Sequence, residues 1–184
     1  MALTETVAIP LGFTAPEFSL LNVITGKMDS FGEHHGSKGT VVMFICNHCP
    51  YVVHVREKLV DIGNHYIPLG IGFIAISSND VEAYPADSPD KMNELSQQMN
   101  FPFPYLYDET QDVAKAYDAV CTPDIAVFDE NDRCVYRGRM DDSSPGNGKP
   151  VTGAELVACL DSLLRNEDVD NIQYPSMGCN IKWK

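Results

Sequence analysis

The pattern of apolar and polar residues predicts a strand, a helix and a second strand in the first half of the chain. The unbroken apolar run at residues 41–45 is typical of a buried strand, and residues 70–77 are expected to form a second buried strand. Between them, apolar positions such as Val52 and Ile62 recur with helical spacing. Pro50 suits the first turn of this helix, because the N–H group that proline lacks would have no partner there.

The segment before the strand at 41–45 is expected to hold a hairpin followed by a loop. Alternation over residues 18–23, followed by a glycine turn at 25–27, predicts a β-hairpin. Residues 30–40 are polar and contain glycine, which favours a loop. The first ten residues show no clear periodic element.

The second half of the chain alternates between short helical and strand patterns. Ser88 before Pro89 is typical of a helix start, and we expect that helix to reach about residue 99. The remaining expected elements are a strand at 105–107, a helix at 111–117, an antiparallel hairpin at 125–128 and 134–137, and a helix at 154–164.

This order predicts an α/β fold with a mixed central β-sheet flanked by helices on both faces. We find neither repeats nor a domain boundary, so residues 1–184 are expected to form a single domain. The tail, from about residue 167 to 184, holds few apolar residues and is expected to be extended.

Composition narrows the classes of function. Of 184 residues, 13 are basic and 26 acidic, and the net charge of −13 disfavours nucleic acid and anionic membrane surfaces. No stretch approaches the ~20 apolar residues of a membrane helix, and the first residues lack the pattern of a secretory signal. Six cysteines without the dense spacing of a secreted disulfide scaffold favour a cytoplasmic location.

The motif Cys46-Asn47-His48-Cys49-Pro50, directly behind the first buried strand, is the strongest chemical signal. A strand that ends in C-x-x-C before an amphipathic helix is typical of a redox dithiol. The N-terminus of a helix carries partial positive charge and unpaired N–H groups, which stabilise a thiolate. We therefore expect Cys46 to be an exposed thiolate and Cys49, one helical turn later, to be the resolving thiol.

His48 lies between the two cysteines and has two interpretations. A protonated imidazole would add positive charge near the thiolate and lower its pKa. The alternative is an exposed residue at the helix start without a chemical role.

Four segments together resemble the thioredoxin-like superfamily, in particular the redoxins related to the alkyl hydroperoxide reductase and thiol-specific antioxidant (AhpC/TSA) group. They are Ala15-Pro16-x-Phe18, the C-x-x-C motif, Thr122-Pro123-Asp124, and the closing Gly178-Cys179-Asn180-Ile181-Lys182-Trp183, which looks like the ending of a branch of uncharacterised thiol-disulfide redoxins. The resemblance implies a thioredoxin-like fold with an added N-terminal β-hairpin.

The resemblance also implies roles for residues near the dithiol. Pro123 would be a cis-proline that faces the two cysteines, although an ordinary trans proline at a strand start is the alternative. Thr122, with Asn47 and Pro50, would contact an extended substrate. Arg137 would correspond to an arginine that holds peroxide in peroxiredoxins, but we favour a solvent-facing strand residue.

The other cysteines divide into two groups. Cys134 and Cys159 lie within strand and helix patterns and are interpreted as small buried apolar residues. Cys121 and Cys179 are candidates for an auxiliary disulfide or electron relay, with simple burial as the alternative.

The leading hypothesis is a thiol-disulfide oxidoreductase that exchanges disulfides through Cys46 and Cys49, with Cys46, Cys49, His48 and Pro123 in the active site. Its partners would be a protein or small-molecule disulfide and an electron donor such as a thioredoxin reductase or glutathione system. No cofactor is implied, and without a second C-x-x-C or H-x-x-x-H pair no metal site is expected.

Two alternatives remain open from the sequence. One is a peroxiredoxin-like thiol peroxidase. Peroxiredoxins have a threonine three residues before the peroxidatic cysteine, and here Cys46 occupies that position relative to Cys49, which counts against peroxidase as the main activity. The other is a non-catalytic thioredoxin-fold binding module.

Overall fold

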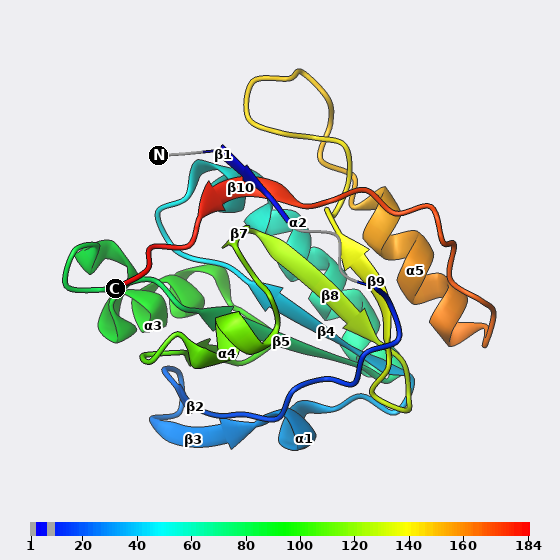
Figure 1. Cartoon of the computed structure of the whole chain (residues 1–184), viewed down its shortest axis with the longest axis horizontal. Coiled ribbons are helices and arrows are strands. Elements are labelled where there is room, and N and C mark those ends of the chain that lie inside the picture. The colour runs from blue at the N-terminus through cyan, green and yellow to red at the C-terminus, as the bar shows by residue number, and fades with distance from the viewer. Residues whose placement is uncertain (1–2, 7–9) are drawn as a thin grey trace.

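A seven-stranded mixed sheet forms the centre of the computed structural model, which describes residues 3–6 and 10–184 (Figure 1). Its order is β3-β2-β6-β5-β4-β8-β9. β4 and β6 run parallel to β5, and the other neighbours are antiparallel. The strands are β2 (Ser19–Asn22), β3 (Lys27–Ser30), β4 (Gly39–Phe44), β5 (Ile71–Ser77), β6 (Tyr105–Tyr107), β8 (Asp124–Phe128) and β9 (Cys134–Gly138).

Helices cover both faces of this sheet, as the sequence predicts. Alternation along β4 sends Val41 and Met43 into the apolar cluster beneath α2, α3 and α5, and Val42 and Phe44 into the cluster beneath α1 and α4. The helices are α1 (Phe31–His34), α2 (Pro50–Tyr66), α3 (Pro89–Met99), α4 (Asp112–Ala116) and α5 (Ala154–Leu164), with short 3-10 turns at Ile67–Leu69 and Pro85–Asp87.

Most predicted elements are confirmed within a residue or two. α3 begins behind the N-cap Ser88 with Pro89 in its first turn, and its last residue, Met99, is followed by the C-cap Asn100, whose φ of 51° is left-handed. The N-terminal hairpin is β2 and β3. One expectation fails here: residues 30–40 are not a continuous loop, because Phe31–His34 form α1, which buries the ring of Phe31.

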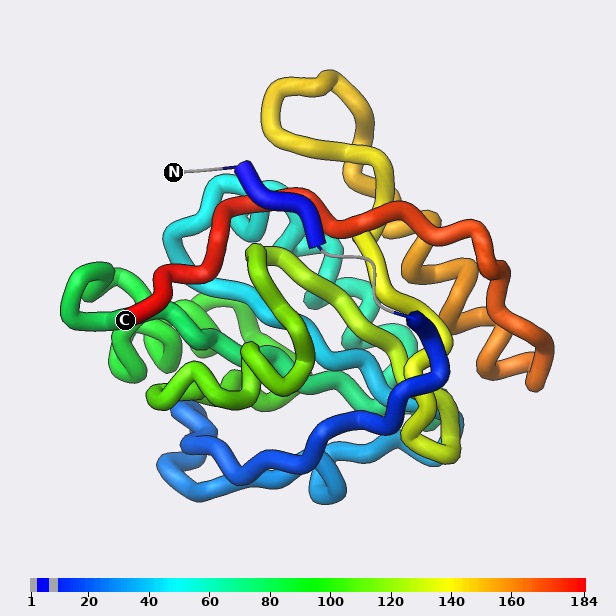
Figure 2. Tube along the Cα trace, viewed as in Figure 1, coloured from blue at the N-terminus to red at the C-terminus, as the bar shows by residue number. Residues whose placement is uncertain are grey.

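A second, three-stranded sheet joins the two ends of the chain, in the order β1-β10-β7. β1 (Leu3–Glu5) and β7 (Cys121–Thr122) both pair antiparallel with β10 (Met177–Asn180). Figure 2 shows the tail crossing the molecule beside the N-terminal strand. Residues 3–5 thus form a strand in a segment where the sequence shows no clear periodic element, while residues 1–2 and 7–9 lie outside the described residues.

Strands this short carry almost no periodic signal, and their partners lie far away in the sequence.

Within the described parts of the chain, no helix is both long enough and apolar enough to cross a bilayer.

Candidate active site

The C-x-x-C motif forms the loop between β4 and α2. Cys49 is the N-cap residue of α2, and Pro50 is its first helical residue. Cys46 therefore precedes the helix, and the expectation that the two cysteines share a helical turn is wrong. The loop still brings the two side chains into hydrogen-bond contact with each other.

Asp87, which the sequence analysis missed, holds this loop in place. Its Oδ1 accepts hydrogen bonds from the backbone N–H groups of Asn47, at 2.8 Å, and of His48, at 3.3 Å. Its Oδ2 lies 2.6 Å from His48 Nδ1 and accepts a hydrogen bond from Asn79 Nδ2 at 2.8 Å. The carboxylate is fully buried, and these donors replace its lost hydration. Only a tertiary contact links Asp87 to the motif, so no sequence pattern marks it.

Asn47 is also engaged by the protein. Its Oδ1 accepts a hydrogen bond from Tyr105 OH at 3.1 Å, and its Nδ2 donates to the carbonyl oxygen of Ala86 at 2.9 Å. These contacts fix the loop. The role in substrate binding that the resemblance implies for Asn47 and Pro50 stays a prediction.

Cys46, His48 and Asp87 bring potential metal-ligand atoms within 4.8 Å of one another. Both carboxylate oxygens of Asp87 already accept hydrogen bonds from the loop and from Asn79, which accounts for the cluster without an ion. The imidazole of His48 also stacks on Tyr84, with 5.4 Å between ring centroids.

The segment Thr122-Pro123 faces the dithiol. The Thr122–Pro123 peptide bond is cis, as the resemblance implies. Cys46 Sγ lies 3.5 Å from Thr122 Oγ1, and Cys49 Sγ lies 3.2 Å from the carbonyl oxygen of Thr122. The fold thus brings Thr122 to the two sulfurs, although it follows Cys46 by 76 residues and Cys49 by 73 residues in the chain.

The expectation that Cys46 is exposed is wrong: it is 1% exposed, and Cys49 is 0% exposed. The C-terminal tail supplies the physical reason. β10 pairs with β7 at Thr122, and the backbone of Lys182 hydrogen-bonds to Asn79 and Asp80. These contacts hold the tail against Thr122, which contacts both sulfurs, and against Asn79, which donates a hydrogen bond to Asp87. The sulfurs nevertheless contact polar groups, so they do not lie in a purely hydrocarbon environment.

The two thiols differ in acidity. The hydrogen bond from Cys46 lowers the pKa of Cys49 to about 4, and the Cys179 thiol and the Val52 N–H at the start of α2 act in the same direction against burial. The same Cys46–Cys49 hydrogen bond, burial and the negative charge of Asp87 raise the pKa of Cys46. The shared hydrogen bond therefore favours ionisation of Cys49 over Cys46, whereas the sequence predicts the thiolate on Cys46.

The remaining cysteines lie in different surroundings. Burial raises the pKa of both Cys121 and Cys134 to about 12. Cys159 is buried on α5, which agrees with its interpretation as an apolar core residue, as does the burial of Cys134. Cys179 is buried as well, but its side chain hydrogen-bonds to Cys49.

The interpretation of Arg137 as a solvent-facing strand residue is wrong. Arg137 is buried, and its guanidinium donates to the carbonyl oxygens of Tyr117 and Asp118 and to Asp124 Oδ2, the last at 3.2 Å. All three acceptors are groups of the protein itself, so these contacts give Arg137 a structural role. Peroxide binding by this side chain stays a prediction.

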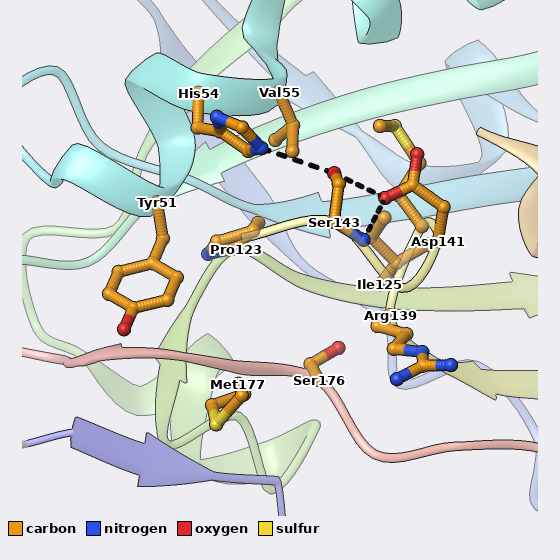
Figure 3. A pocket seen from close by; sticks show the side chains of 11 residues that line it. Tyr51, His54, Val55, Pro123, Ile125, Arg139, Asp141, Ser143, Ser176 and Met177 are labelled. Carbon is orange, nitrogen blue, oxygen red and sulfur yellow. Dashed lines mark hydrogen bonds between the residues drawn. The ribbon is translucent and has the colours of Figure 1, made fainter. Parts of the chain in front are cut away.

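A small pocket of about 30 Å³ opens beside Pro123 (Figure 3). Tyr51 and His54 project from α2 on one side, and Ser176 and Met177 of the tail lie on the other. His54 Nε2 lies 3.2 Å from Ser143 Oγ, which closes a third side. The tail therefore forms a wall of the space next to Pro123.

The fold and this dithiol loop define a thioredoxin-like protein of the redoxin type. A model of the AhpC/TSA family matches residues 11–137, well over half of the chain. The chain belongs to the AhpC/TSA family.

Two solved structures resemble the chain along its whole length. An uncharacterised conserved protein from Geobacillus kaustophilus is 53% identical, with a TM-score of 0.98 over 100% of this chain and 97% of that one. A hypothetical protein from Sinorhizobium meliloti is 42% identical, with a TM-score of 0.96 over 98% of each chain. None of the curated proteins compared with the chain matches it.

A thiol:disulfide interchange protein from Chlorobium tepidum shares the fold at 17% identity. Its TM-score is 0.64 over 85% of this chain and 99% of that one.

Proposed function

We propose that the protein is a thiol-disulfide oxidoreductase that works through Cys46 and Cys49. The Cys46 thiolate attacks one sulfur of a substrate disulfide, and the other substrate sulfur leaves as a thiolate and takes up a proton. Cys49 then attacks Cys46 Sγ, which releases the second substrate thiol and leaves a Cys46–Cys49 disulfide. Two electrons pass from the dithiol to the substrate, and the reverse sequence would oxidise a substrate dithiol.

The contact of both sulfurs with each other and with Thr122 carries this proposal. Because Cys46 and Cys49 share a hydrogen bond, a proton that moves from Cys46 to the Cys49 thiolate turns Cys46 into the nucleophile. Asp87 fixes the loop so that this contact persists. Both sulfurs are buried, and Cys179 of the tail hydrogen-bonds to Cys49, so we expect the tail to move when a protein substrate is admitted.

Reduction of insulin disulfides by dithiothreitol, catalysed by the protein, tests the proposal. Cys46→Ser is expected to reduce the rate to that of dithiothreitol alone. Cys159→Ser is the matched control, because it changes a cysteine that is also buried but lies on α5, near Cys134 and outside the dithiol loop. This variant is expected to keep the wild-type rate. Undiminished activity of Cys46→Ser would contradict the proposal.

Thiol peroxidase activity is a second candidate, supported by membership of the AhpC/TSA family. Stopped-flow measurement of hydrogen peroxide consumption separates the two activities. A second-order rate no faster than that of free cysteine excludes the peroxidase.

The physiological setting is part of the proposal. A cycling dithiol with the other thiols reduced suits the cytoplasm, where a thioredoxin reductase or glutathione system would supply electrons. Titration of the thiols across glutathione ratios would give the reduction potential, and with it the direction of exchange.

A further inference from the structure

The C-terminal strand occupies the backbone edge beside the dithiol. Cys179 on β10 lies directly opposite Thr122 on β7 in an antiparallel register. Gly178 makes this approach possible: a Cβ there would lie 2.0 Å from the carbonyl oxygen of Thr122, and 3.3 Å from the Pro123 side chain. The chain thus has a glycine at the one position of β10 where any side chain would push it away from Thr122.

The register also determines which cysteine meets the dithiol. Residues directly opposite in an antiparallel pair project to the same face, and neighbours along a strand project to opposite faces. Cys179 therefore shares its face with Thr122, whose hydroxyl contacts Cys46, and its side chain hydrogen-bonds to Cys49. Cys121 is opposite Asn180, and its Sγ lies 3.6 Å from Thr6 Oγ1.

We infer that Cys179 is a third redox-active thiol, which takes over the disulfide from Cys46–Cys49 to form a Cys49–Cys179 disulfide. This inference rests on the proposed function, which supplies the Cys46–Cys49 disulfide. Cys179 Sγ, as a thiolate, attacks Cys49 Sγ; the Cys46–Cys49 bond breaks, and Cys46 leaves as a thiolate and accepts the proton that Cys179 gave up. One disulfide and one thiol are present before and after, so no further oxidant is consumed.

Contacts around the tail suit this exchange. Hydrogen-bonded sulfurs need only a small shift to reach bonding distance of about 2.05 Å. Burial and the neighbouring Cys49 raise the pKa of Cys179 to about 12 in the reduced protein, and the Lys182 ammonium group acts in the opposite direction. Oxidation of Cys49 removes its charge and therefore one of the groups that hold Cys179 protonated.

A Cys49–Cys179 disulfide would bond β10 covalently over the site. The tail is otherwise held by hydrogen bonds, among them Lys182 N–H to Asn79 Oδ1 at 2.8 Å and Ile181 N–H to the Val120 carbonyl oxygen at 3.0 Å. The bond would keep the Thr122 edge closed to substrates while the protein remains oxidised. Reduction of this disulfide would allow the tail to move again.

Oxidation of the Cys46→Ser protein by oxidised glutathione tests the inference. Glutathione first attaches to Cys49, and Cys179 is then expected to displace it, so that the Cys49 and Cys179 thiols are lost together and no glutathione stays bound. Trypsin separates Cys49, Cys121 and Cys179 into three peptides, since arginines lie between them in the sequence. Mass spectrometry is expected to find the Cys49 peptide linked to the Cys179 peptide.

Two double variants make the result specific. Cys46→Ser with Cys179→Ala is expected to keep glutathione on Cys49, and Cys46→Ser with Cys121→Ala is expected to form the same link as Cys46→Ser alone. A persistent glutathione adduct in the single variant, or a Cys49–Cys121 link, would overturn the inference.

Wild-type protein titrated with the same reagent is the second measurement, and it avoids any folding defect of the variants. A Cys46–Cys49 disulfide without any Cys49–Cys179 link would refute the third thiol and leave the proposed function standing. Absence of the Cys46–Cys49 disulfide itself, with no insulin reduction, would instead refute the proposed function.

Discussion

The carboxylate of Asp87 accepts a hydrogen bond from His48 Nδ1 at 2.6 Å, although the two residues lie 39 positions apart in the chain. The same carboxylate receives the backbone N–H groups of Asn47 and His48, so one buried side chain holds the middle of the C-x-x-C loop. Its charge also opposes ionisation of Cys46. Asp87 thus positions the loop and at the same time raises the pKa of Cys46.

Asp87→Asn is expected to destabilise the protein by about 1–3 kcal/mol, because the new amide N–H would face the donors on His48 and Asn79. It is also expected to lower the pKa of Cys46, since the negative charge is removed. Urea unfolding and the pH dependence of Cys46 alkylation in a Cys49→Ser background measure the two effects. Asp142→Asn, which disrupts only an exposed ion pair with Lys149, should change stability by less than about 1 kcal/mol.

Gly178→Ala tests how tightly the tail closes the site. Its Cβ would meet the Thr122 carbonyl oxygen, so we expect β10 to be displaced and unfolding to become easier by about 1–3 kcal/mol. Alkylation of Cys46 and Cys49 in the folded protein should become faster, as followed by mass spectrometry over time. Gly32→Ala is the matched control, because open space surrounds Gly32. Unchanged alkylation in Gly178→Ala would show that β10 does not limit access.

These contacts explain which features the sequence could predict. The central strands and α2 follow from local periodicity and from Pro50, and the C-x-x-C motif gives both cysteines. Asp87 and the pairing of β10 with Thr122 depend on contacts between distant segments, and no local pattern encodes them. The burial of Cys46 is hidden from the sequence for the same reason: the motif indicates a reactive thiol, but Thr122, which contacts its sulfur, lies 76 residues away and pairs with a strand from the end of the chain.

The pH dependence of stability tests the lowered pKa of Cys49. The pKa of Cys49 is about 4 in the folded protein and that of an ordinary thiol, about 8.5, in the unfolded chain. At pH values between these two, the unfolded chain therefore binds more protons than the folded protein. The free energy of unfolding of the reduced protein should therefore rise with pH over this interval, by at most about 1.4 kcal/mol per pH unit. This contribution is complete above the unfolded pKa and is lost as the pH falls through the folded pKa.

Urea unfolding in the presence of reductant, at several pH values from about 5 to 8, measures this slope. The difference between wild type and Cys49→Ser isolates the contribution of Cys49 from those of the carboxylates. Parallel curves for the two proteins would show that Cys49 is protonated in the folded state.

Arg137 and Asp124 form a buried ion pair whose role can be separated from peroxide chemistry. Their side chains are 5% and 2% exposed, and the guanidinium also caps two backbone carbonyl groups. Arg137→Leu leaves the Asp124 carboxylate buried without its cation, which is expected to cost about 3–5 kcal/mol. Arg137→Leu combined with Asp124→Asn should recover part of this loss, because no uncompensated charge then remains. Chemical unfolding of the three proteins measures both effects. If Arg137→Leu kept wild-type stability but lost the consumption of hydrogen peroxide, Arg137 would act in the peroxide site rather than in the core.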